Sequence, residues 1–168
     1  MQFLNCFRCA FRGIIYCISN ERNMRIHTVV ALYVFAFSFF FHLSRIAYAA
    51  LFLTFAAVIM GEMFNTAAEE ICDFIVPHFD TAVRRIKDMS SGAVLVAAIF
   101  SVLIGICLFW RPEVFMSIAA YYGAHPVMIA VLAATAVISI VFIVLGPHGI
   151  RDRVMKRRNR RGRKKQLG

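Results

Sequence analysis

The sequence predicts an all-α polytopic membrane protein, with an N-terminal amphipathic helix in the membrane interface and four transmembrane helices. Hydrophobic residues make up 61% of the 168 residues, and the mean hydropathy is +0.72. Soluble domains contain only roughly 45–50% apolar residues, and a soluble chain this short could not enclose the excess, so lipid must cover it. Apolar runs of transmembrane length and the placement of the basic residues support the same class.

The segment 1–25 is predicted to be the interfacial helix. Phe3, Phe7 and Phe11 recur on one side of it, while Arg8 and Arg12 lie four residues apart on another. Aromatic bulk beside basic residues is typical of helices that lie in the membrane interface. The arginines also interrupt any apolar core, so we expect no cleavable signal peptide.

Four apolar runs define the predicted spans, because each can cross about 30 Å of hydrocarbon. Pro77 ends the second run and Gly146-Pro147 ends the fourth. The spans are expected at 26–44, 46–76, 89–110 and 126–145. The chain is therefore divided into a core of residues 1–110, an outer loop and additional helix over 111–150, and a basic tail over 151–168.

The distribution of charge predicts that both termini are cytoplasmic. The net charge is +10, and the tail 151–168 alone holds ten basic residues and one acidic residue. With four spans, the N-terminal segment, the basic loop 77–88 and the tail share one side, which the positive-inside rule makes cytoplasmic. We expect the tail to bind anionic lipid headgroups. Nucleic acid is not expected as a partner, because no aromatic residues are interleaved with the charges.

The second span carries a polar stripe in its cytoplasmic half. Asn65, Glu69 and Asp73 lie about 60°, 20° and 20° from Glu62 around a helix axis, and the set covers about 16 Å of depth. Ionisable groups at membrane depth are costly and usually functional. Glu62 is nearest to the bilayer interior, where a lipid hydroxyl would lie, so it is the candidate general base. Glu69, about two turns nearer to the cytoplasm, could hold a divalent ion on ATP.

Residue chemistry alone leaves other classes of protein open. Lys87-Asp88 follows in the cytoplasmic loop and could contact a nucleotide, and Glu21 arrives from the interfacial helix at a similar depth. The same acids could instead pair with nearby arginines in a non-catalytic scaffold, or line an ion-conducting pore. No glycine-rich nucleotide loop is recognisable, so the nucleotide is not established by this pattern.

Three separated motifs resemble signatures of the prokaryotic diacylglycerol kinase and undecaprenol kinase family. Residues 62–73 (EMFNTAAEEICD) match its E-x-x-N-[ST]-A-x-E-x-x-x-D element. Residues 87–95 (KDMSSGAVL) match K-D-x-x-[SA]-[AG]-A-V-L, with Ile86 where the family usually has alanine. Residues 21–27 (ERNMRIH) resemble the E-x-N-x-R-I-H element of the undecaprenol kinase branch, and Phe11-Arg12-Gly13 stands where the family has A-x-[KR]-G-[LI].

The resemblance implies an ATP- and Mg²⁺-dependent lipid kinase that forms a homotrimer in the bacterial inner membrane. It implies Glu62 as catalytic base, Asn65 beside it, and Glu21 and Glu69 as ligands of the metal. Nucleotide contacts are assigned to Lys87, Asp88 and Asp73, with His78 and Asp80 added from their position in the same loop; lipid contacts are assigned to Arg12, Gly13, Asn23, Arg25 and Ser91. Residues 21–27 favour undecaprenol as acceptor, with diacylglycerol as the alternative. Family members usually end after the third span, so the resemblance implies nothing about 111–168.

Overall fold

The computed structural model describes residues 2–76 and 80–166, and helices dominate both ranges. The elements are α1 (Gln2–Asn20), α2 (Arg22–Ser38), the short 3-10 helix η1 (Phe39–Phe41), α3 (Arg45–Ile75), α4 (Thr81–Phe109), α5 (Pro112–Ala124) and α6 (Pro126–Gln166). Four stretches of the described chain are long and apolar enough to cross a membrane: Arg22–Phe41, Arg45–Ile75, Thr81–Phe109 and Pro126–Pro147. The predicted class, an N-terminal helix followed by four candidate spans, is confirmed.

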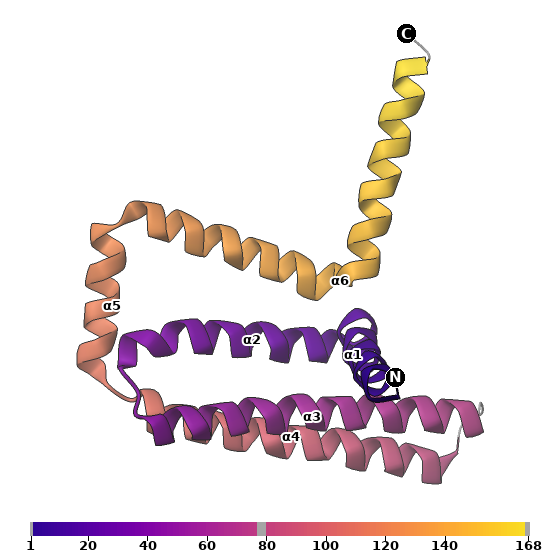
Figure 1. The fold of residues 1–168 in the computed structure, drawn as a ribbon, viewed down its shortest axis with the longest axis horizontal. Coiled ribbons are helices and arrows are strands. Elements are labelled where there is room, and N and C mark those ends of the chain that lie inside the picture. Colours follow the sequence, from indigo (N-terminus) through magenta and orange to yellow (C-terminus); the bar gives the residue numbers. More distant parts are fainter. Residues whose placement is uncertain (1, 77–79, 167–168) are drawn as a thin grey trace.

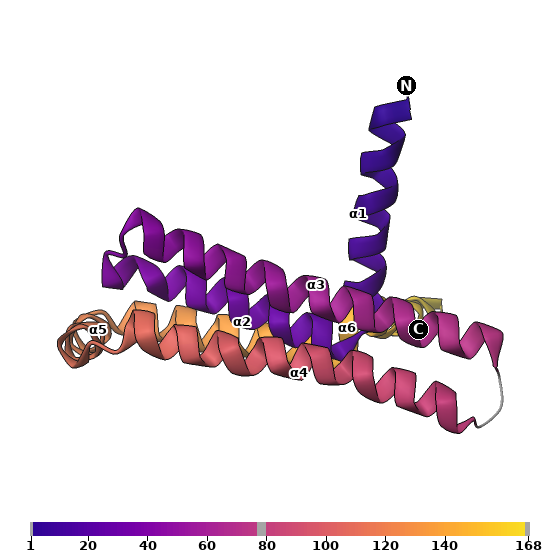
Figure 2. The same cartoon turned by 90° about the horizontal axis from the view of Figure 1, so that it is seen from below.

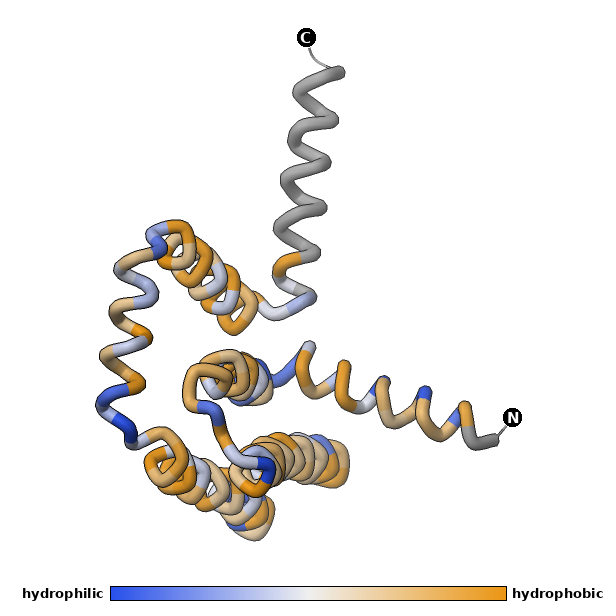
Figure 3. The backbone as a smooth tube through the Cα atoms, turned by 60° about the vertical axis from the view of Figure 1, so that its left-hand side comes forward, coloured by the Kyte–Doolittle hydropathy of each residue, from blue (hydrophilic) through white to orange (hydrophobic). Residues whose placement is uncertain are grey.

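The helices α2, α3 and α4 run side by side, and the most extensive packing joins α3 to α4 (Figure 1). The first part of α6 lies along α2, and α5 connects the far ends of α4 and α6. Figure 2 shows that α1 projects across the direction of this bundle, the arrangement expected of a helix in the membrane interface. Apolar residues follow the four spans, and polar residues gather toward their ends (Figure 3).

The predicted segment 1–25 is divided at Glu21. Glu21 has an extended backbone (φ −95°, ψ 124°) and forms the N-cap of α2. Its N–H donates to the Cys17 carbonyl at 2.8 Å, so the end of α1 stays tied to the junction. The first span therefore begins at Arg22, and the junction holds Glu21 beside the bundle rather than inside a continuous interfacial helix.

The start of the third predicted span also differs, because α4 begins at Thr81, well before the apolar run at 89–110. Asp80 is the N-cap of α4, and its Oδ1 accepts from the N–H groups of Ala82 at 2.6 Å and Val83 at 3.2 Å. Such a cap contributes about 0.5–2 kcal/mol to a helix. Asp80, which was predicted to contact the nucleotide, thus has a structural role at this helix start.

The outer loop expected between the third and fourth spans contains a helix, α5 (Pro112–Ala124). Pro112 stands at the first helical position and Glu113 in the first turn, both of which favour a helix start. Arg111 Nη1 donates to the Phe41 carbonyl at 3.1 Å. The rings of Phe41 and Phe115 also meet with their centroids 5.5 Å apart. The segment is therefore packed against the turn between α2 and α3.

Candidate functional site

Glu62 is the centre of the polar cluster. Its side chain is on α3 and only 2% exposed. The Asn23 side chain, at the start of α2, lies beside it, and the carboxylates of Glu21 and Glu69 are close enough to act on its charge. Two helices thus bring three carboxylates and an amide together. This confirms that Glu62 and Glu69 share a face of α3, and it shows how Glu21 reaches them.

A chain of hydrogen bonds fixes the carboxylate of Glu69. The Nδ2 group of Asn65 donates to Glu69 Oε1 at 2.9 Å, and Ser90 Oγ on α4 donates to Asn65 Oδ1 at 2.7 Å. Asn65 is 8% exposed, so both ends of its amide are used where water is largely excluded. Ser90 was not predicted as a site residue. It stands at a variable position of the 87–95 motif, so only the α3–α4 packing reveals its contact.

The predicted nucleotide-binding residues lie at the more exposed end of the same helices. Lys87 Nζ pairs with Asp73 Oδ1 at 2.5 Å, and Arg84 Nε pairs with Asp88 Oδ2 at 3.8 Å. The Asp73 side chain is 69% exposed, whereas Glu62 is buried. The polar stripe of α3 therefore runs from a buried carboxylate to an accessible ion pair. His78 lies outside the described residues, so its predicted role stays a prediction.

The predicted lipid-binding residues are not gathered at one place. Arg12 and Gly13 are exposed on α1, and Arg12 Nη2 donates to Cys9 Sγ at 3.1 Å. Ser91 is exposed on α4, where its hydroxyl donates to the carbonyl of Asp88 at 3.2 Å. Arg25 is 7% exposed and its guanidinium faces backbone carbonyls. Of this set, only Asn23 contacts the cluster around Glu62 in the described part of the chain.

The end of α1 is docked on α3 by two residues that sequence analysis missed. Tyr16 OH donates to Glu70 Oε1 at 2.6 Å. This hydrogen bond and the charge of Glu70 raise the pKa of Tyr16, so its phenol remains a donor. Cys17 is 6% exposed and its thiol lies at hydrogen-bonding distance from Thr66; burial raises the pKa of the Cys17 thiol. These contacts hold the chain just before Glu21 against the site.

The residues present fit a Mg²⁺ ion that is shared with a phosphate substrate. Among the described residues, no group of three or more His, Cys, Asp or Glu side chains could hold a metal by itself. The ion pairs found in that part of the chain also leave Glu21, Glu62 and Glu69 without a cationic partner. Mg²⁺ is commonly bound by one or two carboxylates together with substrate phosphates. Glu21 and Glu69, which both act on the charge of Glu62, are carboxylates of the kind that such an ion requires.

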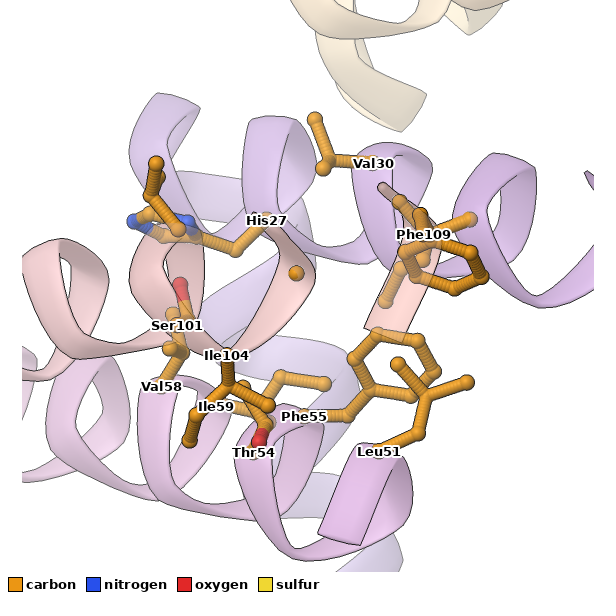
Figure 4. A pocket seen from close by; sticks show the side chains of 14 residues that line it. His27, Val30, Leu51, Thr54, Phe55, Val58, Ile59, Ser101, Ile104 and Phe109 are labelled. Carbon is orange, nitrogen blue, oxygen red and sulfur yellow. The ribbon is translucent and has the colours of Figure 1, made fainter. Parts of the chain in front are cut away.

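An apolar cavity of about 210 Å³ lies between α2, α3 and α4 (Figure 4). Its polar side chains are His27, Thr54 and Ser101, and the remaining lining is apolar. Val58, on its wall, stands one helical turn before Glu62, and His27 stands one turn after Asn23. The cavity therefore begins where the polar cluster ends, on the same faces of α2 and α3.

Comparison with known proteins agrees with this arrangement. The chain is 40% identical over 107 residues to the diacylglycerol kinase of Synechocystis sp., covering 63% of this chain and 61% of that relative's length. It is 33% identical over 108 residues to the undecaprenol kinase of Bacillus subtilis, covering 64% of this chain and 88% of the relative. Residues 8–109, from α1 to the end of α4, match the prokaryotic diacylglycerol kinase family. The chain belongs to the prokaryotic diacylglycerol kinase family.

Proposed function

We propose that this protein transfers the γ-phosphate of ATP to the hydroxyl group of a membrane lipid. The observation that carries this proposal is the position of Glu62, buried between a cluster of carboxylates and an apolar cavity. A lipid whose hydrocarbon chain enters the cavity presents its hydroxyl at Glu62. The exposed end of the polar stripe, around Asp73 and Lys87, is open to a water-soluble nucleotide, which approaches from the side opposite to the lipid.

Each residue of the cluster has a defined part in such a transfer. Glu62 accepts the proton of the lipid hydroxyl as the hydroxyl oxygen attacks the γ-phosphorus, and the bond between that phosphorus and the departing ADP breaks. Asn23 holds the carboxylate of Glu62 in place. Glu21 and Glu69 bind Mg²⁺, which when bound neutralises charge on the β- and γ-phosphates of ATP. Asn65 and Ser90 keep the Glu69 carboxylate in one orientation.

The exposed residues of the site are proposed to contact the nucleotide and the lipid headgroup. Lys87, Asp88 and Asp73 contact the nucleotide, with Lys87 exchanging Asp73 for a phosphate group. Arg12, Gly13 and Ser91 face the headgroup region on the lipid side. The bare cluster contains three carboxylates, so positive charge from Lys87 and the metal ion is needed before a triphosphate can bind.

We favour undecaprenol as the acceptor, because residues 21–27 (ERNMRIH) place Asn23 against Glu62 and resemble the undecaprenol kinase element. Diacylglycerol is the second candidate, since a relative with 40% identity carries the name diacylglycerol kinase. The proposed assembly is a homotrimer in the bacterial inner membrane with both termini in the cytoplasm. The side chains of the tail 151–168 lie outside the described part of the structure, so headgroup binding there stays a prediction.

The proposal is tested by following phosphate transfer from γ-labelled ATP to lipid. Purified full-length protein is incubated with Mg²⁺ and detergent micelles that contain undecaprenol or diacylglycerol. Wild type should label one of the two lipids, and Glu62→Gln should not. Glu113→Gln is the matched control, because Glu113 is an exposed acid on α5 outside the family match.

Two other outcomes would favour the other classes of protein. Folded wild type that labels neither lipid contradicts both proposed acceptors and favours a non-catalytic scaffold. Ion flux into liposomes without ATP, lost in Glu62→Gln, favours an ion conductor.

A further inference from the structure

The side chain of Arg25 joins three helices inside the membrane part of the protein. It lies on α2 and is 7% exposed. Its Nη1 donates to the carbonyls of Ile18 at 3.2 Å and Ser19 at 3.1 Å, in the last turn of α1. Its Nε donates to the carbonyl of Ile143 on α6 at 3.1 Å. A buried guanidinium is tolerated only when its donors are used in this way.

The carbonyl of Ile143 is available because α6 is interrupted at Gly146-Pro147. In an uninterrupted helix the Ile143 carbonyl would accept from the N–H of the residue four positions later. That residue is Pro147, which has no N–H, so the carbonyl is left without its helical donor. An unpaired carbonyl inside a membrane is costly. Arg25 supplies the missing donor, so the interruption of α6 provides a point of attachment to α2.

Gly146 allows the close approach that this contact needs. Its φ is +63°, a conformation that residues with a side chain rarely adopt. A Cβ atom added at Gly146 would lie 2.9 Å from Arg25 Nη1 and 3.4 Å from the Ser19 carbonyl oxygen. The Gly146-Pro147 pair, which looks in the sequence like a simple end of the span, is therefore shaped around the guanidinium of Arg25.

We propose that α6 is a positioning element of the phosphoryl-transfer site and that Arg25 is the positioning residue through which it acts. Arg25 follows Glu21 by four residues, and its N–H donates to the Glu21 carbonyl at 3.3 Å. The carbonyls that its side chain binds on α1 precede Glu21 by two and three residues. Arg25 thus holds the α1–α2 junction, where Glu21 and Asn23 reach Glu62. The inference rests on the proposed function of Glu21 as a metal ligand.

The test uses full-length protein with substitutions at the two ends of this contact. Pro147→Ala restores an N–H that competes for the Ile143 carbonyl, and Gly146→Ala places a methyl group against Arg25. Arg25→Gln removes the donor. Pro126→Ala is the control for a proline in α6, because Pro126 is at its first position, where no N–H is required. Gly123→Ala is the control for glycine, because nothing lies within 4 Å of its added Cβ.

The kinase readout is the Mg²⁺ concentration at half-maximal rate. It should rise about 3- to 10-fold in Pro147→Ala and Gly146→Ala, which is within the range expected from losing one ordinary hydrogen bond, with a smaller change in kcat at saturating Mg²⁺. The double variant Arg25→Gln/Pro147→Ala should be no worse than Arg25→Gln alone, since both act through one contact. The control variants should behave as wild type. Additive effects, or an unchanged Mg²⁺ requirement, would overturn the inference.

A second readout does not depend on activity. Cys17 is buried beside the junction, so maleimide should label it faster in Pro147→Ala and Gly146→Ala than in wild type, as measured by peptide mapping. Cys72, buried on α3, is the internal reference and should keep its rate. Wild type that labels no lipid would contradict the proposed function while leaving this readout in force. An unchanged Cys17 rate in both variants would overturn the positioning role.

Discussion

The helices α3 and α6 are both candidate membrane spans, but they are built differently. Of the six residues that α3 buries, three are polar: Glu62, Asn65 and Thr66. Among the residues of α6 whose exposure the structure describes, only Gly146 is buried. The interior of α3 is thus used for polar chemistry, whereas α6 touches the rest of the chain at selected points and leaves most of its surface to lipid.

This difference indicates how a helix can be added to a catalytic bundle. The family match ends at residue 109, so α6 joins a site that the first four helices already contain. It brings no ionisable side chain to the cluster around Glu62 in the described residues. It offers the carbonyl of Ile143 to Arg25 and the hydroxyl of Ser139 to Tyr33 on α2 instead. Substitutions in α3 and α6 should therefore affect catalysis and stability differently.

The largest effect is expected for Glu62→Gln, which keeps the shape of the side chain and removes its basicity. The transfer rate should fall by about 10²- to 10⁴-fold, the usual contribution of a general base. Steady-state kcat measured with labelled ATP tests this value. A variant that keeps a tenth of the wild-type rate would exclude Glu62 as the base.

A large effect on metal dependence is expected for Glu69→Gln. Loss of a ligand should raise the Mg²⁺ concentration for half-maximal rate by more than about tenfold, because even a change in the partners of a ligand costs about 10- to 100-fold in metal affinity. Titration of Mg²⁺ at fixed ATP measures the shift. Glu113→Gln on α5 should leave the Mg²⁺ concentration for half-maximal rate unchanged. A shift in Glu113→Gln equal to that in Glu69→Gln would indicate a general effect of lost negative charge.

A moderate effect is expected for Ser90→Ala, which removes the donor to Asn65 Oδ1. The loss of one such bond is worth about 0.5–1.5 kcal/mol, or a rate decrease of roughly 2- to 12-fold. Comparison of kcat/KM with Ser117→Ala is the appropriate measurement, since Ser117 donates only to a carbonyl of its own helix α5. Equal values for the two variants would mean that the Asn65 amide is held without Ser90.

The smallest effect is expected at the contact between α2 and α6. Tyr33 OH and Ser139 Oγ are 3.3 Å apart, and Tyr33→Phe removes this hydrogen bond. The free energy of unfolding should decrease by about 0.5–1.5 kcal/mol while kcat stays at the wild-type value. Denaturant unfolding in detergent, with Tyr121→Phe as reference, measures the change. A fall in kcat comparable to that of Ser90→Ala would show that α6 acts on catalysis through this contact as well.

Sequence reasoning could predict those features that depend on local pattern. The spans follow from apolar length, and the stripe of α3 follows from helical spacing, since Asn65 and Glu69 are four residues apart. The start of α4 was misplaced because the N-cap Asp80 and the charged first turns precede the apolar run.

Contacts between distant segments could not be predicted in the same way. Ser90 reaches Asn65 only through the packing of α4 on α3, and Tyr16 reaches Glu70 across 54 residues of chain. Arg25 was assigned to the lipid on the resemblance of residues 21–27 to the family element. Its position between carbonyls depends on where α6 returns, and no local pattern contains that information.

The long separation between Arg25 and its partner on α6 has a consequence for biosynthesis. Ile143 follows Arg25 by 118 residues, which at roughly 5–20 residues per second corresponds to a delay of about 6–24 s in translation. The carbonyls of Ile18 and Ser19 are made before Arg25, so α1 can hold the guanidinium during that interval. Of the four spans, α6 is then inserted last. The ribosome therefore completes the helices of the catalytic site before the contact between Arg25 and the Ile143 carbonyl can form.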